Sequence, residues 1–195
     1  MGTQNQVSLL SDESQRAVSQ SRFQNLPPQT DLGKQELSDW KCKVATFQMS
    51  VKTTPIMEQV SLFEPILDPA EAIDPFSLPQ QNTEFWRWQF SDVGVAALYF
   101  VIDYQSELLL YVGETVKSNQ RWKGEHDCKR YLMNYRQAHY HHGLESQLGI
   151  AFWRHAPAER RPRQRIESAL IYKWRSPFNK ENWTFWGTPF IGDVS

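Results

Sequence analysis

Two apolar runs joined by only four residues constrain the fold more than any other part of this sequence. The first run is VAALYFVID (residues 95–103), the second is LLLYVG (residues 108–113), and YQSE lies between them. Each run has the length of a buried strand, and so short a connection joins neighbouring antiparallel strands. The sequence therefore predicts a β-hairpin over residues 95–113.

The segments after the hairpin predict two helices and one more strand. SNQRWKGEHDCKRYLMNYRQAHY (residues 118–140) has a partial helical stripe of apolar residues, and LGIAFWRHA (residues 148–156) has the composition of a strand. RQRIESALIYKWRS (residues 163–176) places its apolar residues on one helical face, and Pro177 stops that helix. We therefore expect an α/β (α+β) domain over residues 94–195, with a small, three-stranded, mainly antiparallel sheet flanked by helices.

The N-terminal part of the chain predicts less regular structure. Residues 1–35 are rich in Gln and Ser and end near two prolines and a glycine, which is typical of a disordered or loosely attached tail. Residues 36–93 form an irregular N-terminal extension of unknown role, in which KVATFQMSV (residues 43–51) alternates like a strand. FWRWQF (residues 85–90) is also strand-like; its aromatic side chains could stack bases, although packing on a core is the preferred interpretation.

Several classes of protein are excluded by composition. Two cysteines make neither a disulfide framework nor a metal site by spacing, and no apolar run approaches the length of a membrane span. The first residues have no charged segment followed by an apolar one, as a signal peptide would. The HYHHG stretch, with His139, His141 and His142, has no cysteine or carboxylate at zinc-ligand spacing, so we read it as a loop or helix end. We expect a soluble, cytoplasmic protein that does not enter membranes.

Charge is distributed unevenly along the 195 residues. Residues 1–116 hold seven Lys and Arg against fifteen Asp and Glu, a net charge of −8, whereas residues 117–180 hold fourteen against five, a net charge of +9. A partner rich in phosphate would bind the second region, although a solvated basic face is an equal alternative. The candidate nucleic-acid-binding residues are Lys117, Lys123, Arg154, Arg160, Arg161, Arg163 and Arg165.

Residues with catalytic potential lie at the hairpin and at the start of the next helix. Tyr99 lies inside the first strand and Tyr111 at the end of the second, so the two can approach on neighbouring strands. Arg121 opens the following segment, and Glu125 and His126 lie one helical turn further on. Each also has a structural interpretation, since the tyrosines can cap a core with an exposed hydroxyl and His126 can be a surface residue.

Two more candidates lie in and after the last helix. Glu167 is flanked by Arg163 and Arg165, so it is either a salt-bridge partner or a metal ligand. Asn179 follows the helix and can serve as a loop cap or as part of a site.

The order of these residues resembles that of the GIY-YIG nuclease family. The two name motifs correspond here to ALY (residues 97–99) and YVG (residues 111–113), and Arg121 follows Tyr111 by ten residues. RIESALIYKWRSPFN supplies a helical glutamate followed by a proline and an asparagine, as in the family. The resemblance covers residues 95–183. The sequence departs from the family pattern at two points. Ala97 and Leu98 stand where the family has Gly-Ile, and Glu125 stands where the family has His or Tyr.

The resemblance implies phosphodiester hydrolysis with one divalent metal. Glu167 would hold Mg²⁺ or Mn²⁺, Arg121 would neutralise charge on the phosphate, and Tyr99 would take the proton of the attacking water. The glycine of YVG would let the chain turn at the edge of the site. The implied catalytic set is Tyr99, Tyr111, Arg121, His126, Glu167 and Asn179, with Tyr111 positioning water or phosphate, Asn179 bracing the site, and Glu125 as the alternative to His126.

The implied partner is DNA, with RNA or branched DNA as open alternatives and a homodimer as a further one. Two rival functions remain at this point. One is a nucleic-acid-binding protein with the same fold and no remaining catalysis. The other is a protein-interaction module whose basic face meets an acidic partner, which would not bind DNA in a salt-dependent manner.

Overall fold

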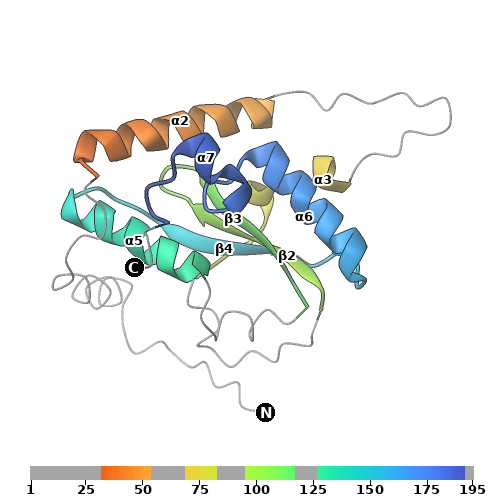
Figure 1. Ribbon diagram of the computed structural model, residues 1–195. Helices are drawn as coiled ribbons and strands as arrows, with labels where there is room; N and C mark the ends of the chain where they lie inside the picture. The colour runs from red at the N-terminus through yellow and green to blue at the C-terminus, as the bar shows by residue number, and fades with distance from the viewer. Residues whose placement is uncertain (1–31, 54–68, 83–94, 117–126, 192–195) are drawn as a thin grey trace, which may run out of the picture.

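The computed structural model describes residues 32–53, 69–82, 95–116 and 127–191 (Figure 1). These residues form an α+β structure in which helices flank one four-stranded antiparallel sheet. Among the described helices, none combines the length and the apolar composition needed to cross a bilayer. The strands are β1 (Gln80–Asn82), β2 (Ala97–Asp103), β3 (Leu108–Thr115) and β4 (Leu148–Trp153).

The sheet has the strand order β1-β4-β2-β3. Strands β2 and β3 form the predicted hairpin, with a turn at residues 104–107, and β4 pairs with the other side of β2. The prediction of three strands is one too few, because the short strand β1 pairs with β4 and extends the sheet. A three-residue strand of glutamines and asparagine has no apolar pattern, so no periodicity predicts it.

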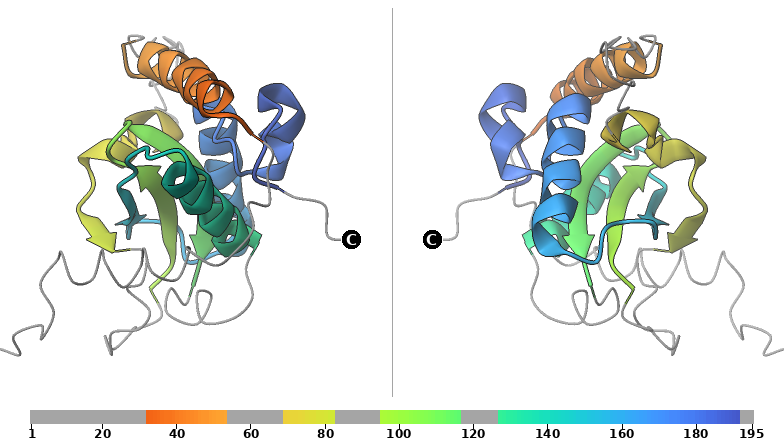
Figure 2. Two further views of the ribbon diagram at one scale, coloured as in Figure 1. Left: turned by 90° about the vertical axis from the view of Figure 1, so that its left-hand side faces the viewer. Right: turned by 90° about the vertical axis from the view of Figure 1, so that its right-hand side faces the viewer.

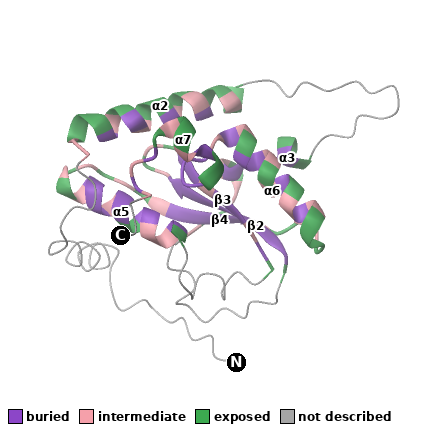
Figure 3. Cartoon of the chain, in the orientation of Figure 1, coloured by how far each residue is buried: buried purple, intermediate pink, exposed green. Residues whose placement is uncertain are grey.

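Strand β2 lies at the centre and is buried along its whole length. Its side chains alternate between two cores: Tyr99 and Val101 join the cluster on the α5 side, and Leu98 and Phe100 join the cluster on the α6 side. A strand covered on both faces needs apolar residues at every position, which explains the unbroken run in the sequence. Figure 3 shows the buried sheet and the mixed burial of the surrounding helices.

The helices surround the sheet on three sides. Figure 1 shows α2 along the top, α5 at the lower left and α6 at the right, and Figure 2 shows the short helix α7 beside α2 and α6. Two single turns of 3-10 helix, η1 and η3, complete the described structure. The bounds are α2 Lys34–Thr53, α3 Pro69–Ala72, η1 Pro75–Ser77, α5 Asp127–His141, α6 Arg160–Trp174, η3 Lys180–Asn182 and α7 Trp183–Trp186.

Helix α2 replaces the strand expected at residues 43–51. Its buried residues are Leu37, Trp40, Val44 and Gln48, which are spaced by three or four positions and therefore share one helical face. Three of them, Leu37, Trp40 and Val44, pack in the core that also holds Tyr99, so this part of the N-terminal extension lies against the sheet. The helix also begins at Lys34, inside the segment expected to be a tail.

The last helix matches its prediction closely. In α6 the buried residues Ile166, Leu170 and Trp174 form the expected stripe, and the helix ends at Arg175 in the left-handed conformation, before Pro177. Within the segment 118–140 predicted as the earlier helix, the structure describes α5 from Asp127 onward. FWRWQF lies outside the described residues, as do residues 117–126.

Candidate active site

The two tyrosines of the hairpin lie together, as expected. The β2–β3 register pairs Tyr99 with Gly113 and Val101 with Tyr111, so both tyrosines point to the α5 side of the sheet. Their rings stack with centroids 5.8 Å apart and an angle of 28° between planes. Tyr99 is fully buried, whereas Tyr111 is partly exposed. Tyr111 is therefore the member of the pair that solvent can reach.

Gly113 makes room for the ring of Tyr99. A Cβ atom at this position would lie 2.3 Å from Cζ and 2.4 Å from the hydroxyl oxygen of Tyr99, far inside any real contact. The expected turn at this glycine is wrong, because β3 continues through it to Thr115. What the YVG motif requires here is space for a neighbouring side chain.

Asn179 attaches the segment after α6 to the middle of β3. Its side-chain oxygen accepts a hydrogen bond from the backbone N–H of Val112 (2.9 Å), and its side-chain nitrogen donates to the carbonyl of Val112 (2.8 Å). Ser176 donates to the same side-chain oxygen at 2.6 Å and fixes the orientation of the amide. Asn179 therefore binds the residue between Tyr111 and Gly113, as a bracing role requires.

The outer edge of β3 has two further partners. A β-bulge opposite Val101 and Ile102 leaves Leu110 as an extra residue of β3, and its carbonyl accepts a hydrogen bond from the backbone N–H of Phe178. Gln48 of α2 binds both the N–H (2.8 Å) and the carbonyl (2.9 Å) of Leu109. The Gln48 side chain and the backbone of Phe178 thus supply hydrogen bonds that a neighbouring strand would otherwise make.

Glu167 lies on α6, which packs against β3, and its side chain is partly exposed. The Nε atom of its neighbour Arg163 lies 2.6 Å from a carboxylate oxygen of Glu114 on β3. Among the described residues, no three His, Cys, Asp or Glu side chains are grouped as a metal site. A single partly exposed carboxylate nevertheless fits Mg²⁺, which keeps several waters and uses one or two protein carboxylates.

Arg163 is not a nucleic-acid contact, contrary to the sequence prediction. It is 3% exposed, and besides Glu114 it donates to the carbonyls of Pro157 and Ala158 at 2.8 Å. Its guanidinium holds the turn before α6 onto β3, which leaves no face for a phosphate. The other four arginines of this region are exposed: Arg154, Arg160, Arg161 and Arg165.

Several predicted residues lie outside the described part of the chain. The list comprises Lys117, Arg121, Lys123, Glu125 and His126. The structure therefore brings Tyr99, Tyr111 and Asn179 together around β3, places Glu167 on the helix packed against that strand, and does not describe the arginine or its helper base.

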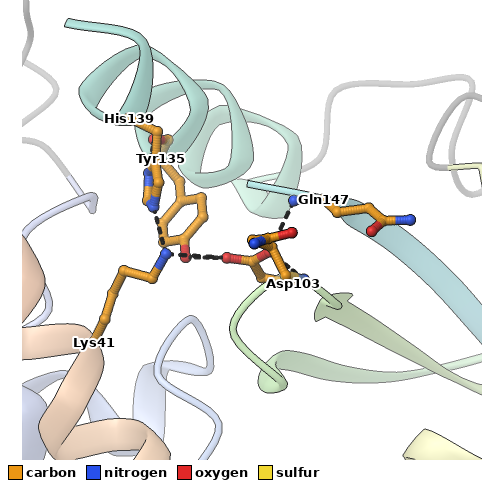
Figure 4. Close-up of polar contacts among 6 residues, drawn as sticks. Lys41, Asp103, Tyr135, His139 and Gln147 are labelled. Atoms are coloured by element: carbon orange, nitrogen blue, oxygen red, sulfur yellow. Dashed lines mark hydrogen bonds and ion pairs between the residues drawn. The ribbon is translucent and has the colours of Figure 1, made fainter. Parts of the chain in front are cut away.

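A second polar cluster, missed from the sequence, lies at the other end of β2 (Figure 4). The carboxylate of Asp103 is fully buried; one oxygen accepts from the Tyr135 hydroxyl (2.7 Å) and from Lys41 (3.3 Å). The other oxygen accepts from the backbone N–H groups of Gln147 (2.9 Å) and Gln105 (3.2 Å). The only local signal was a carboxylate at the end of an apolar run.

His139 completes this cluster in its neutral form. Its Nδ1 lies 2.7 Å from the carbonyl oxygen of Tyr135, which can only accept, so Nδ1 carries the proton and Nε2 accepts from Lys41 at 2.8 Å. Burial and the neighbouring ammonium of Lys41 lower the pKa of His139 to about 4. Burial also lowers the pKa of Lys41, although the carboxylate of Asp103 opposes this effect.

Comparison with known proteins gives no family for this chain. A scan against protein-family models, a search of curated proteins and a search of solved structures each found no match. Function is therefore inferred from the side chains and their geometry.

Proposed function

We propose that this protein is a metal-dependent endonuclease that hydrolyses phosphodiester bonds of DNA with one divalent ion, Mg²⁺ or Mn²⁺. The observation that carries the proposal is the convergence on β3: Tyr99 stacks on Tyr111, and Asn179 binds Val112, the residue after Tyr111. The two tyrosines meet through the hairpin, whereas Asn179 lies 67 residues from Val112 in the sequence. The resemblance to the GIY-YIG nucleases expects these residues in one site, and this contact supports the proposal.

The metal would be held by the carboxylate of Glu167, at the partly exposed face of α6. When bound, such an ion polarises the phosphate and stabilises the leaving oxygen. Arg121 would donate hydrogen bonds to the phosphate oxygens and neutralise the charge that grows there, since a planar guanidinium matches a phosphate group.

The tyrosines have different roles in this proposal from those expected from the sequence. Tyr99 is fully buried, so it is poorly placed to take a proton from an entering water. Tyr111 is partly exposed and is backed by the ring of Tyr99, so we assign the contact with water to Tyr111. A phenol with an ordinary pKa of about 10 is a weak base at neutral pH, which leaves a helper role for His126 or Glu125.

The exposed arginines near the start of α6 would contact the nucleic-acid backbone. Arg154, Arg160, Arg161 and Arg165 extend into solvent at the end of β4 and the beginning of α6. Phosphate contacts of this kind position the substrate without reading its sequence. RNA and branched DNA are substrates of the same chemistry, so the assay must include them.

The second candidate function is nucleic-acid binding by the same fold without catalysis. The burial of Tyr99 favours it, because a fully enclosed hydroxyl is a core feature as readily as a catalytic one. The two candidates share the exposed arginines and differ only in whether a bond is broken.

A cleavage assay separates the two. The wild type is incubated with supercoiled, linear, single-stranded and branched DNA and with RNA, in Mg²⁺, Mn²⁺ or EDTA, beside the Glu167→Gln, Arg121→Ala and Tyr111→Phe variants. We expect metal-dependent nicking that falls about 100-fold or more in the Glu167 and Arg121 variants, because each removes a group that acts on the reacting phosphate.

The matched control is Glu145→Gln, which removes an exposed carboxylate from the loop between α5 and β4. It should cut like the wild type. Salt-dependent binding without any cutting by the wild type would instead support the second candidate and refute hydrolysis.

A further inference from the structure

The outer face of α6 carries a continuous stripe of basic and aromatic side chains. Arg161, Arg165, Ser168 and Tyr172 are all exposed and follow one another at intervals of four, three and four residues, so they share one helical face. Arg175 continues the same line at the end of the helix. Over these positions the helix axis extends about 21 Å.

Arg161 and Arg165 of this stripe differ in their partners from two other cations of α6, Lys173 and Arg163. Lys173 lies 2.8 Å from a carboxylate oxygen of Glu71, and Arg163 binds Glu114. In the part of the chain that the structure describes, neither Arg161 nor Arg165 takes part in an ion pair. Positive charge along the outer face of α6 is therefore available to an anionic partner.

Aromatic rings extend the stripe onto α7. The guanidinium of Arg175 lies 4.3 Å from the ring centre of Tyr172 and 5.1 Å from that of Phe185. Tyr172 remains 69% exposed and Phe185 55% exposed, so each ring still presents area to solvent. The two large rings are among the most exposed of the described hydrophobic side chains, which is unusual for a purely structural residue.

The base of this aromatic group is rigid. Phe185 packs against Trp186 with ring centres 4.8 Å apart and against Phe47 of α2 at 6.1 Å. Trp186 donates its indole N–H to the carbonyl of Arg175, which fixes α7 to the end of α6. Rings held in this way lose little entropy when a flat ligand stacks on them.

We propose that this stripe, defined as Arg161, Arg165, Tyr172, Arg175 and Phe185, binds a single strand of nucleic acid. Phosphates would meet the arginines, and unpaired bases would stack on Tyr172 and Phe185, the combination that single-strand-binding surfaces use. A duplex offers its phosphates but hides the faces of its bases, so it would use only the arginines. The choice of nucleic acid as ligand rests on the proposed function, and the stripe refines it by naming an unpaired strand as part of the substrate.

The test measures binding without cleavage. Fluorescence anisotropy is recorded in EDTA with a labelled oligothymidylate, an oligomer of the same length that lacks bases, and a duplex. The variants are Tyr172→Ala, which replaces an exposed helical residue by the best helix former, Tyr172→Phe, which keeps the ring, and Phe185→Ala. Met133→Ala, at an exposed position of α5, is the matched control.

We expect Tyr172→Ala to weaken binding of the oligothymidylate about 5- to 100-fold, the range of one stacked base. Binding of the baseless oligomer and of the duplex should change less than about twofold, and Tyr172→Phe and Met133→Ala should bind like the wild type. Loss of affinity for all three ligands alike would overturn the stacking proposal.

Three other outcomes also overturn it, and the first two separate it from the proposed function. If the oligothymidylate binds equally well to the wild type, Tyr172→Ala and Phe185→Ala, the stripe is refuted while the endonuclease proposal stands. If light scattering shows a wild-type dimer that Tyr172→Ala dissociates, the rings form a contact between copies of the chain. If the wild type binds no nucleic acid, both proposals fail together.

Discussion

The two ends of β2 carry polar side chains on the same face of the sheet. The two ends differ in how completely other protein groups enclose these side chains. At the Asp103 end, four donors surround a fully buried carboxylate, and Lys41 and His139 bind each other. At the Tyr99 end, Tyr111 stays partly exposed and lies over the fully buried Tyr99. The carboxylate at the first end is closed to solvent and bonded on both oxygens, whereas the tyrosine at the second end is reached by solvent.

The comparison teaches how to distinguish a structural polar cluster from a candidate site. Burying a charge is costly unless partners replace the lost water, so a cluster that serves the fold must supply every partner itself. A cluster that serves a ligand must leave part of its surface open.

The largest effect should come from breaking the Asp103 end. Asp103→Ala leaves the Lys41 ammonium and the Tyr135 hydroxyl without their shared acceptor, so we expect the free energy of unfolding to fall by about 3–5 kcal/mol. Urea denaturation measures this. The control is Glu107→Ala, whose exposed pair with Lys52 should contribute less than about 1 kcal/mol. A loss as small as that of the control would mean that the Asp103 cluster contributes little to the stability of the fold.

The second effect is a dependence of stability on pH. The pKa of His139 is about 4 in the folded protein and about 6.5 in the unfolded chain. Between these values only the unfolded chain binds the proton, so the free energy of unfolding should fall as pH drops from 6.5 to 4, by about 2–4 kcal/mol in total. Urea denaturation across this window should show the dependence in His141→Asn, an exposed control, and lose it in His139→Asn.

Two smaller effects at the edge of β3 should distinguish a residue that only stabilises the fold from one that also supports cleavage. Asn179→Ala and Gln48→Ala each leave one N–H and one carbonyl of β3 without a partner, so each should cost about 1–3 kcal/mol. Only Asn179→Ala should also lower cleavage, because Val112 adjoins Tyr111 whereas Leu109 does not. Denaturation and cleavage assays on both variants, run at a temperature where both are folded, check this. Equal cleavage by the two variants would remove Asn179 from the site.

The smallest effect should be a gain in stability that is accompanied by a loss of DNA affinity. Arg161 lies in the first turn of α6, where a positive charge opposes the helix dipole and no acidic residue is present. Arg161→Glu should therefore stabilise the fold by about 0.3–1 kcal/mol and yet weaken DNA binding and reduce the slope of log affinity against log salt. Lys43→Glu, on the exposed face of α2, should leave DNA affinity unchanged. If Arg161→Glu binds DNA with unchanged affinity, the basic face around Arg161 is only solvated and does not contact DNA.

The parts of the fold predicted from sequence are those with a local pattern. The hairpin follows from two apolar runs and a four-residue turn, and α6 follows from an apolar residue on every turn. Helix α2 was misread because residues 44–49 also alternate, and because the buried position Gln48 is polar. Its partners are Leu109 and Trp174, which no local pattern can indicate.

The candidate site was predicted in part for the same reason. The stacking of Tyr99 on Tyr111 follows from hairpin pairing, which is local. Arg163 and Arg165 look alike in the sequence, and only Glu114, 49 residues away, distinguishes the buried one from the exposed one. The role of Gly113 depends on the ring that faces it across the hairpin.

The bulge at Leu110 sets the phase of everything that follows it in β3. Side chains alternate between the two faces of a strand, and the extra residue lets both Leu110 and Tyr111 point to the α5 side. Without the bulge, Leu110 would pair with Val101 and Tyr111 would pair with Phe100, whose side chain lies in the cluster on the α6 side. The bulge therefore holds Tyr111 on the same side of the sheet as Tyr99, so the one residue of β3 that has no partner in β2 decides which face the site occupies.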